Sequence, residues 1–451
     1  MQDAKIVVAV KYCGGDLNPF DAAALECALY TGSRDITVLT MSPPSVMPKL
    51  EALTRLGVKA VLLTDAAYAG ADTLATARTL AAFIKRQPPD FIFCGRQSTD
   101  GDTAQVPPCL SALIGYDIVP SVMRLDGDTA YLRSGENRAL TGRQVVTFER
   151  IKSLRFPSIK AKPAEVTTID NNELRLPLDL CGQRGSPTRV LKVYENRTGK
   201  RLCKFIGFDS LEATIKAALS KQRARVAEYD GPKLKEVYYT SGAKEQARRI
   251  AYKCVKLDVE GRDAAAVAAE IRQKSAGIIL WSDAPQMRVL APQVAGLLGA
   301  GLCADCTELK TDGENLFMIR PAAGGSVTAE IQCRAPVTMA TVRTAGSDGS
   351  IIFSVGRGAE RAVGKIREMA DRLGAEVCCS RAVVDDDVMP YECQVGLTGR
   401  TVAPKVYVAF GISGAVQHMC AVERAGTVIA VNKDKNAKIF DYADYGIVAE
   451  V

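Results

Sequence analysis

The chain has 451 residues, of which 47% are apolar and 24% charged, and its 58 basic and 51 acidic side chains give a formal charge of +7. This composition is typical of a globular protein with about two to four domains, and the charge is spread too evenly to indicate nucleic-acid binding. The single histidine, His418, excludes zinc sites built from several histidines, and the 14 scattered cysteines are typical of reduced thiols in the cytoplasm.

Short apolar runs alternate with amphipathic segments from the first residues onward. The alternation predicts strands at 6–10, 36–41, 61–64 and 90–94, and helices at 19–30, 49–56, 73–86 and 107–114. A β-α rhythm of this kind predicts a Rossmann-like α/β fold, with a parallel sheet covered on both faces and a ligand site at the carboxyl ends of the strands. No apolar run is long enough to span a bilayer and no signal peptide is evident, so we expect a cytoplasmic protein without a membrane segment.

The order helix, strand, loop, helix at 80–115 recurs at 267–299 with the same spacing. The repeat predicts two related domains that pack as a pseudo-symmetric pair. Their loops differ sharply, because 95–105 is rich in Gly, Asp, Ser and Thr whereas 282–288 is not. We therefore do not expect both loops to hold the same ligand.

A third unit begins at about residue 352, with predicted strands at 351–355, 376–379, 405–410 and 427–431. A helix is predicted at 362–373, and another precedes this unit at 211–226. Small and polar residues follow each of the four strands, at 356–358, 380–381, 411–418 and 432–434. In a parallel sheet these loops share one edge, where backbone amides can hold a nucleotide-like cofactor; ordinary αβ turns are the alternative on pattern alone.

Longer motifs resemble a known family. The segments 380–385, 394–404, 411–418, 429–434 and 443–448 closely resemble the flavin domain of the electron-transfer flavoprotein α subunit, and 320–325 and 339–343 resemble its first domain. The segments 18–21, 70–76, 95–106, 155–159 and 185–188 resemble the β subunit. The resemblance implies a fusion of a β-like part (1–205), a linker (206–234), a shortened α-like first domain (235–345) and an α-like FAD domain (346–451). The first strand and helix of that shortened domain are not evident before Val237, and 205–230 is a candidate to replace them.

The resemblance assigns roles at the C-terminal FAD site. Arg381 matches the arginine over the flavin ring, where a guanidinium favours negative charge on the reduced ring, and His418 matches the histidine that hydrogen-bonds the flavin C2 carbonyl. Without the motifs, a surface salt bridge and a structural histidine would be the simpler interpretations. Leu397 replaces the family's usual Gln, and Thr398 matches the threonine near flavin N5. The other residues matched to this site are Arg357, Ser380, Val395, Gly396, Ser413, Gly414, Ala415, Val416, Gln417 and Asn432.

A second site is implied in the β-like part. It is formed by Ala9, Asn18, Pro19, Phe20, Asp21, Gly95, Asp102, Thr103, Ala104, Gln105 and Val106. In single-flavin members this site holds AMP, but the sequence from Asp100 to Gln105 is similar to the bifurcating group, in which a second FAD takes hydride from NADH. Both ligands remain open, and the resemblance favours the second FAD. No metal site is expected, since the pair Cys303 and Cys306 is interpreted as core.

The resemblance implies an FAD-dependent electron carrier. In the bifurcating form it would act as an NADH-dependent oxidoreductase that delivers one electron toward an acyl-CoA dehydrogenase and the other to ferredoxin or flavodoxin. The alternatives are a single-FAD carrier with structural AMP and no NADH activity, and a nucleotide-binding protein without a redox role. A Gly- and Ser-rich hinge is expected at 345–350.

Overall fold

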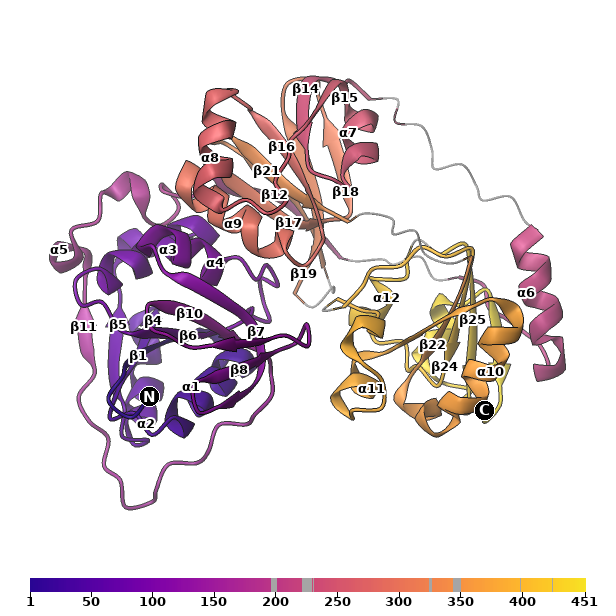
Figure 1. Cartoon of the computed structure of the whole chain (residues 1–451), viewed down its shortest axis with the longest axis horizontal. Coiled ribbons are helices and arrows are strands. Elements are labelled where there is room, and N and C mark those ends of the chain that lie inside the picture. Colours follow the sequence, from indigo (N-terminus) through magenta and orange to yellow (C-terminus); the bar gives the residue numbers. More distant parts are fainter. Residues whose placement is uncertain are drawn as a thin grey trace. The chain divides into compact units, whose positions relative to one another are not determined.

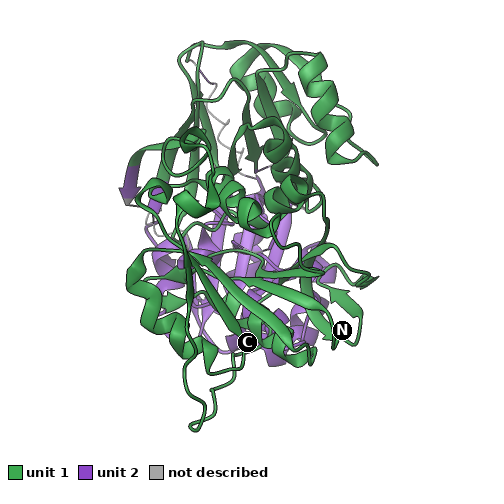
Figure 2. Ribbon diagram, turned by 90° about the vertical axis from the view of Figure 1, so that its left-hand side faces the viewer, with its two compact units in different colours: residues 1–192, 231–323, 329–342 green, residues 193–230, 324–328, 343–451 purple. Residues whose placement is uncertain are grey.

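We analysed a computed structural model of the chain, which describes residues 1–195, 201–220, 229, 231–323, 327–343, 350–397, 399–423 and 425–451. The chain forms two compact units (Figure 2). The first unit comprises 1–192, 231–323 and 329–342, and the second comprises 193–230, 324–328 and 343–451. The expected hinge at 345–350 lies, apart from its last residue, outside the described residues.

The first unit contains a nine-stranded sheet with the order β11-β5-β4-β1-β6-β10-β7-β8-β9. The pairs from β11 to β7 are parallel, as predicted, whereas β7, β8 and β9 form an antiparallel meander that the sequence did not indicate. The strands are β1 Lys5–Ala9, β4 Asp35–Met41, β5 Lys59–Leu63, β6 Phe91–Gly95, β7 Asp117–Asp126, β8 Thr129–Leu132, β9 Asn137–Ala139, β10 Gln144–Phe148 and β11 Thr167–Ile169.

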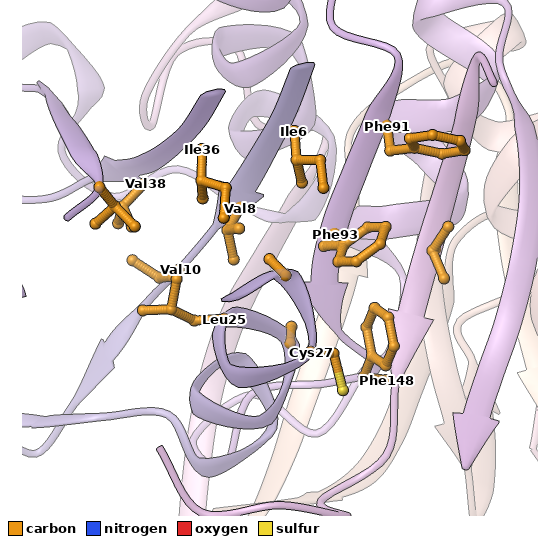
Figure 3. Close-up of a cluster of buried hydrophobic side chains, with 14 of the residues drawn as sticks. Ile6, Val8, Val10, Leu25, Cys27, Ile36, Val38, Phe91, Phe93 and Phe148 are labelled. Atoms are coloured by element: carbon orange, nitrogen blue, oxygen red, sulfur yellow. The ribbon is translucent and has the colours of Figure 1, made fainter. Parts of the chain in front are cut away.

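Helices cover both faces of this sheet because successive strand side chains point to opposite sides. Ile6 and Val8 of β1 share a core with Leu25 of the first helix (Figure 3). Val7, between them in sequence, belongs to the core on the other face, together with Leu80. The helices are α1 Pro19–Tyr30, α2 Met47–Thr54, α3 Thr73–Ile84 and α4 Val106–Ile114, close to the predicted ranges (Figure 1).

A second sheet of the first unit has the parallel order β15-β14-β16-β21-β17. This order is the same as that of β4-β1-β6-β10-β7, so the two copies of the sequence repeat share one topology. The elements are β14 Leu234–Tyr239, α7 Lys244–Ile250, β15 Ala251–Lys256, α8 Ala264–Gln273, β16 Ile278–Ser282, α9 Met287–Leu298, β17 Gly301–Cys306 and β21 Thr338–Val342.

The two copies pack through their equivalent helices, α4 and α9. The Gln293 side-chain amide donates to the Ser111 hydroxyl at 3.1 Å. A Cβ on Gly296 would lie 3.1 Å from Cys109 Sγ, so glycine allows the two helices to approach closely. The predicted pairing of related domains is therefore present in the first unit.

One expectation about the second copy is wrong. Its first strand and helix, which we did not find in the sequence, are present as β14 and α7, and α7 is only seven residues long. A short, charged helix gives little apolar periodicity, which explains why it was missed. The described residues 205–220 of the candidate segment belong to the second unit instead. A further four-stranded sheet, β12-β20-β19-β18, is formed by β12 Thr188–Glu195, β18 Glu308–Thr311, β19 Leu316–Ala322 and β20 Val327–Cys333.

The second unit is built on a parallel sheet with the order β13-β26-β25-β24-β22-β23. Helix α10 ends at Gly374, which adopts a left-handed φ of 63° as predicted for a helix stop. Helix α6 places Leu211 and Ile215 in the core of this unit, so the expected linker 206–234 contains packed structure. The elements are β13 Lys204–Phe205, α6 Leu211–Ser220, β22 Ile351–Val355, α10 Val363–Leu373, β23 Glu376–Cys379, β24 Val406–Phe410, β25 Thr427–Asn432 and β26 Tyr445–Val448.

Across the part of the chain that the structure describes, every helix is too short or too polar to cross a bilayer.

Candidate functional site

The loops after β22 and β24 meet at the carboxyl edge of the second unit's sheet, as the sequence predicted. The Gly356 N–H donates to the Phe410 carbonyl at 2.7 Å, and the Gly358 N–H donates to the Gly411 carbonyl at 3.1 Å. The two loops are therefore joined backbone to backbone, directly beyond the strands from which they emerge.

Glycines make this close approach possible. A Cβ on Gly411 would lie 2.4 Å from the Ala359 nitrogen, and one on Gly414 would lie 2.2 Å from the Ile439 nitrogen. Both glycines also have a left-handed φ, of 63° and 89°. Larger residues would push these loops apart, so the glycines keep an edge at which backbone amides can approach a phosphate-bearing cofactor such as FAD.

Arg381 begins helix α11 (Arg381–Asp385), immediately after β23 and its cap residue Ser380. Its Nε lies 3.1 Å from Asp385 Oδ2, and the side chain is about one-third exposed. The neighbouring Asp holds the guanidinium at the sheet edge while leaving part of it accessible. The Ser380 hydroxyl does not cap α11, and Arg357 Nε lies 3.5 Å from Asp386 Oδ2. These three predicted residues thus follow two neighbouring strands.

His418 lies in the short helix α12 (Val416–Met419) and is buried. Its Nε2 lies 2.7 Å from the hydroxyl of Tyr407, a fully buried residue of β24. Burial lowers the pKa of His418 to about 4, although a hydrogen bond with the Val395 backbone acts in the opposite direction. The imidazole is therefore neutral near pH 7 and is held between two neighbours. Sequence reasoning missed Tyr407, because a tyrosine in an apolar strand looks like ordinary core.

The segment 395–397 is fixed between β23 and α12. The Val395 N–H donates to the Cys379 carbonyl at 2.8 Å, and the Leu397 N–H donates to the Gln417 carbonyl at 2.7 Å. Gly396, between them, has a φ of 146°. The segment is thus brought beside the start of α12, as the motif assignment requires, whereas Thr398 lies outside the described residues.

The loop after β24 is also tied to the end of β25. The Asn432 side-chain amide donates to the Ile412 carbonyl at 2.9 Å, and the Ile439 N–H donates to the Ser413 carbonyl at 3.1 Å. Asn432 thus supports the backbone of the predicted cofactor loop. Ala415 precedes α12 and accepts the His418 N–H at 2.9 Å, which fixes the start of the helix that carries the histidine.

Residues of the predicted second site meet at the carboxyl edge of the first sheet. Asp21, in the first turn of α1, accepts the Lys11 N–H at 2.8 Å and the Gly95 N–H at 2.9 Å. Burial raises the pKa of Asp21 to about 7, against hydrogen bonds from Asn18, Lys11 and Gly95 that act to lower it. The contacts join the ends of β1 and β6 to the start of α1, which brings the predicted residues Ala9, Asn18, Pro19, Phe20, Asp21 and Gly95 to one edge.

The loop between β6 and α4 is anchored to this edge. The Asn18 side-chain amide donates to the Gln97 carbonyl at 2.9 Å, and the Lys11 ammonium lies 2.7 Å from Asp100 Oδ2. Burial would raise the pKa of Asp100, but hydrogen bonds and the charge of Lys11 lower it to about 2. Asp102 and Ala104 adopt left-handed φ angles of 52° and 54°, an uncommon backbone for non-glycine residues. The structure therefore holds a specific, irregular loop at the predicted nucleotide site.

Two buried polar atoms at this loop make no hydrogen bond within the described protein: Asn18 Oδ1 and Gln105 Nε2. Buried polar groups are nearly always satisfied, so these atoms fit a site completed by a polar ligand. Helix α4 begins at Val106 and continues with Pro107 and Pro108, which have no N–H. The amides available to a phosphate are therefore those of Thr103 to Val106, mainly in the loop and not in the first helical turn.

A buried ionic cluster adjoins this edge and was not predicted. Arg96 Nε lies 2.7 Å from Glu149 Oε1, and Arg133 Nη1 lies 3.1 Å from Glu149 Oε2. The Arg96 guanidinium also stands 5.5 Å from the centre of the Phe20 ring. The three charged residues follow β6, β10 and β8, far apart in sequence, so no local pattern could reveal the cluster.

Two other motifs have structural roles. Asp72 caps α3 by accepting the Ala75 N–H at 3.0 Å, and its second oxygen accepts the Thr188 hydroxyl at 2.6 Å. Asp72 therefore joins the segments 70–76 and 185–188. Cys303 and Cys306 are buried free thiols. Within the described ranges, no group of three or more metal-ligating side chains comes together.

The chain matches the sequence profiles of two known domains. Residues 347–423 match the profile of the electron transfer flavoprotein FAD-binding domain, which includes the sheet edge with Arg381 and His418. The profile of the electron transfer flavoprotein domain matches two separate segments, 5–154 and 242–363. Together these two segments cover more than half of the chain, and they contain most strands of the two sheets that share one strand order.

Individual proteins also resemble this chain. An electron transfer flavoprotein subunit alpha from Thermoanaerobacterium thermosaccharolyticum is 35% identical over 221 residues, which cover 39% of this chain and 67% of that protein. Protein FixB from Rhizobium meliloti is 37% identical over 211 residues, covering 36% of this chain and 60% of its own length. An electron transfer flavoprotein subunit alpha from Bacillus subtilis is 30% identical over 224 residues, which cover 40% of this chain and 69% of that protein.

Proposed function

The chain belongs to the electron transfer flavoprotein family, and from that premise we propose that it joins β-like and α-like parts in one polypeptide and bifurcates electrons from NADH. The observation that carries the fusion is the recurrence of one domain profile and one strand order in two segments, 5–154 and 242–363. The alignment to the Thermoanaerobacterium subunit alpha covers 39% of the chain, which leaves room for a β-like part.

In the second unit, the edge formed after β22, β23, β24 and β25 would hold FAD. The glycine-dependent contact between Gly411 and Ala359 supports this fit, because it leaves backbone rather than side chains at the edge. Arg381 would place its guanidinium against the ring and stabilise negative charge there, and His418 would contribute a neutral hydrogen-bonding group. FAD supplies the redox chemistry, since it accepts and releases electrons singly or in pairs.

In the first unit, the loop at 96–105 would hold a second FAD, with AMP as the alternative. The unsatisfied buried atoms Asn18 Oδ1 and Gln105 Nε2 support a ligand with polar edges, which both molecules have. NADH would transfer a hydride, equivalent to two electrons and a proton, to this FAD. One electron would pass to the FAD of the second unit and onward to an acyl-CoA dehydrogenase, and the other to ferredoxin or flavodoxin.

The surface of the first unit offers a candidate contact for a dehydrogenase. Phe156 and Ile159 are 96% and 95% exposed on the irregular segment between β10 and β11. Lys160 and Lys162 are exposed beside them. Two apolar side chains with basic neighbours would fit an apolar pocket with an acidic rim on the partner.

Counting cofactors tests the proposal. The full chain, purified gently, should contain two FAD molecules, and NADH should reduce flavin rapidly. One FAD with one AMP, and no reduction by NADH, would instead establish the single-flavin carrier. A colourless protein that binds only a nucleotide would exclude both the bifurcating protein and the single-flavin carrier.

Two glycine-to-alanine variants test the first-unit site separately from the FAD site of the second unit. In Gly95→Ala a Cβ would lie 2.4 Å from Asp21 Oδ1, so the variant should lose the first-unit ligand and keep the FAD of the second unit. Gly101→Ala is the matched control in the same loop, where a Cβ would meet only Ser98 Oγ at 3.4 Å. Loss of equal amounts of FAD from both variants would contradict the assignment of a first-unit site.

A further inference from the structure

The only histidine of the chain is held by two buried neighbours. His418 Nε2 lies 2.7 Å from the Tyr407 hydroxyl, and the ring also hydrogen-bonds the Val395 backbone. Tyr407 belongs to β24 and is fully buried, whereas Val395 belongs to the segment that the motif resemblance assigns to the flavin site. The histidine therefore connects a core tyrosine to the cofactor edge.

The hydrogen-bond roles follow from the partners. The Val395 contact acts to raise the pKa of His418, as expected for a carbonyl that accepts a ring N–H. A neutral imidazole has one N–H and one acceptor nitrogen, so with Nε2 facing Tyr407 the proton lies on Nδ1. Tyr407 must then donate to Nε2. Burial raises the pKa of Tyr407 well above its usual value, which keeps its hydroxyl proton available for this bond.

We propose that Tyr407 is a positioning residue for His418, whose hydroxyl fixes the neutral imidazole in the tautomer that carries its proton on Nδ1. The Val395 carbonyl accepts this proton, so the imidazole ties the segment 395–397, which the motif resemblance assigns to the flavin site, to the buried strand β24. This consequence for the cofactor rests on the FAD site of the proposed function, whereas the tautomer itself is a property of the chain alone.

The sole histidine allows a direct measurement. Full-length protein without a histidine tag, labelled with heavy-isotope nitrogen in histidine, should give one imidazole in a long-range proton–nitrogen NMR correlation. We expect a protonated Nδ1 and an acceptor-type Nε2 in flavin-free protein. A signal pattern with the proton on Nε2 would overturn the proposal.

Tyr407→Phe removes the donor and keeps the ring. The ratio of the Nδ1–H to the Nε2–H tautomer should fall by roughly fivefold to tenfold, the effect of losing one net hydrogen bond. Tyr442→Phe, a partly buried tyrosine of the same unit, is the control and should leave the pattern unchanged. An unaltered tautomer ratio in Tyr407→Phe would also overturn the proposal.

A measurement with FAD separates this inference from the proposed function. If the imidazole fixed by Tyr407 holds the segment 395–397 in place beside the flavin, the reduction potential of the second-unit FAD should shift in Tyr407→Phe and remain unchanged in Tyr442→Phe. If Tyr407→Phe alters the tautomer of His418 but not the reduction potential of the second-unit FAD, then Tyr407 has no effect on the flavin. Failure of the protein to bind FAD would contradict the proposed function and leave the NMR result intact.

Discussion

The Asp21 carboxylate accepts the backbone N–H of Gly95 at 2.9 Å across 74 residues of sequence, in a site closed to solvent. Burial raises the pKa of Asp21 to about 7, so the native state binds a proton that the unfolded chain releases near pH 4. Between about pH 4 and pH 7 the native state is the more protonated one, and its stability falls as pH rises. We expect this carboxyl to remove up to about 4 kcal/mol from the free energy of unfolding over that range.

The measurement compares wild type with Asp21→Asn. The difference in the free energy of unfolding between the two proteins should change from about pH 4 to pH 7 and be constant above. Trp281, the single tryptophan, is fully buried in the first unit and reports its unfolding by fluorescence. A difference that is independent of pH would show that folding does not raise the pKa of Asp21.

The shared carboxylate of Glu149 should be important for the stability of the first unit. In Glu149→Gln, the guanidinium groups of Arg96 and Arg133 would lose their common counter-ion in a buried site. Breaking a buried ion pair in this way costs about 3–5 kcal/mol. The urea midpoint, followed through Trp281 fluorescence, should decrease markedly.

An exposed pair gives the control for that experiment. Asp35 lies 2.9 Å from the Lys59 ammonium, and both side chains are largely accessible to solvent. Asp35→Asn makes the same chemical change, and an exposed ion pair contributes at most about 1 kcal/mol. Equal midpoints for the two variants would mean that the Glu149 cluster is effectively solvated.

Regular elements with strong apolar periodicity could be predicted from the sequence. The range 19–30 was predicted as a helix and is α1, and the β-α rhythm gave the parallel centre of the first sheet. The meander of β7, β8 and β9 was missed, since alternating half-exposed strands after a parallel sheet have no distinctive local signal.

Candidate site residues could be proposed from the sequence where motifs point to them, but the tertiary contacts around them could not. His418 was found through the motif at 411–418, because one histidine in a chain has no pattern of its own. Its partner Tyr407 was missed, as was the contact of Asp21 with Gly95. These contacts arise when strands distant in sequence end at the same edge, which the sequence pattern alone cannot specify.

Gly414→Ala should reduce FAD binding by the second unit. The new Cβ would lie 2.2 Å from the Ile439 nitrogen, at a φ of 89° that disfavours alanine. The loop would have to move, and the bond from the Ile439 N–H to the Ser413 carbonyl would be lost. The ratio of bound FAD to protein should fall severalfold, with circular dichroism close to that of the wild type.

Gly364→Ala is the matched control, because Gly364 lies in helix α10 and a Cβ there meets no atom within 4 Å. Alanine in a helix should stabilise the unit by roughly 0.5–1 kcal/mol and leave the FAD content unchanged. If Gly414→Ala retained FAD as well as this control does, the loop at 411–418 would not be part of the cofactor site.

Arg381 should control the reduction potential of the second-unit FAD. Its Nε is 3.1 Å from Asp385 Oδ2, so the charge is held at the sheet edge. A guanidinium that stabilises a negatively charged reduced ring contributes about 1.5–3 kcal/mol, equivalent to about 60–130 mV for one electron. Arg381→Ala should lower the potential by that amount in a spectroscopic redox titration, and Arg381→Lys should lie between the two.

The control removes an arginine that is distant from the proposed chemistry. Arg372 is exposed at the end of α10, where it pairs with Glu212 at 3.3 Å. Arg372→Ala changes the net charge of the unit by the same amount but should leave the potential unchanged, because an exposed charge is screened by solvent and salt. An equal decrease in both variants would mean that the overall charge of the unit sets the potential, and Arg381 would then have no specific role at the ring.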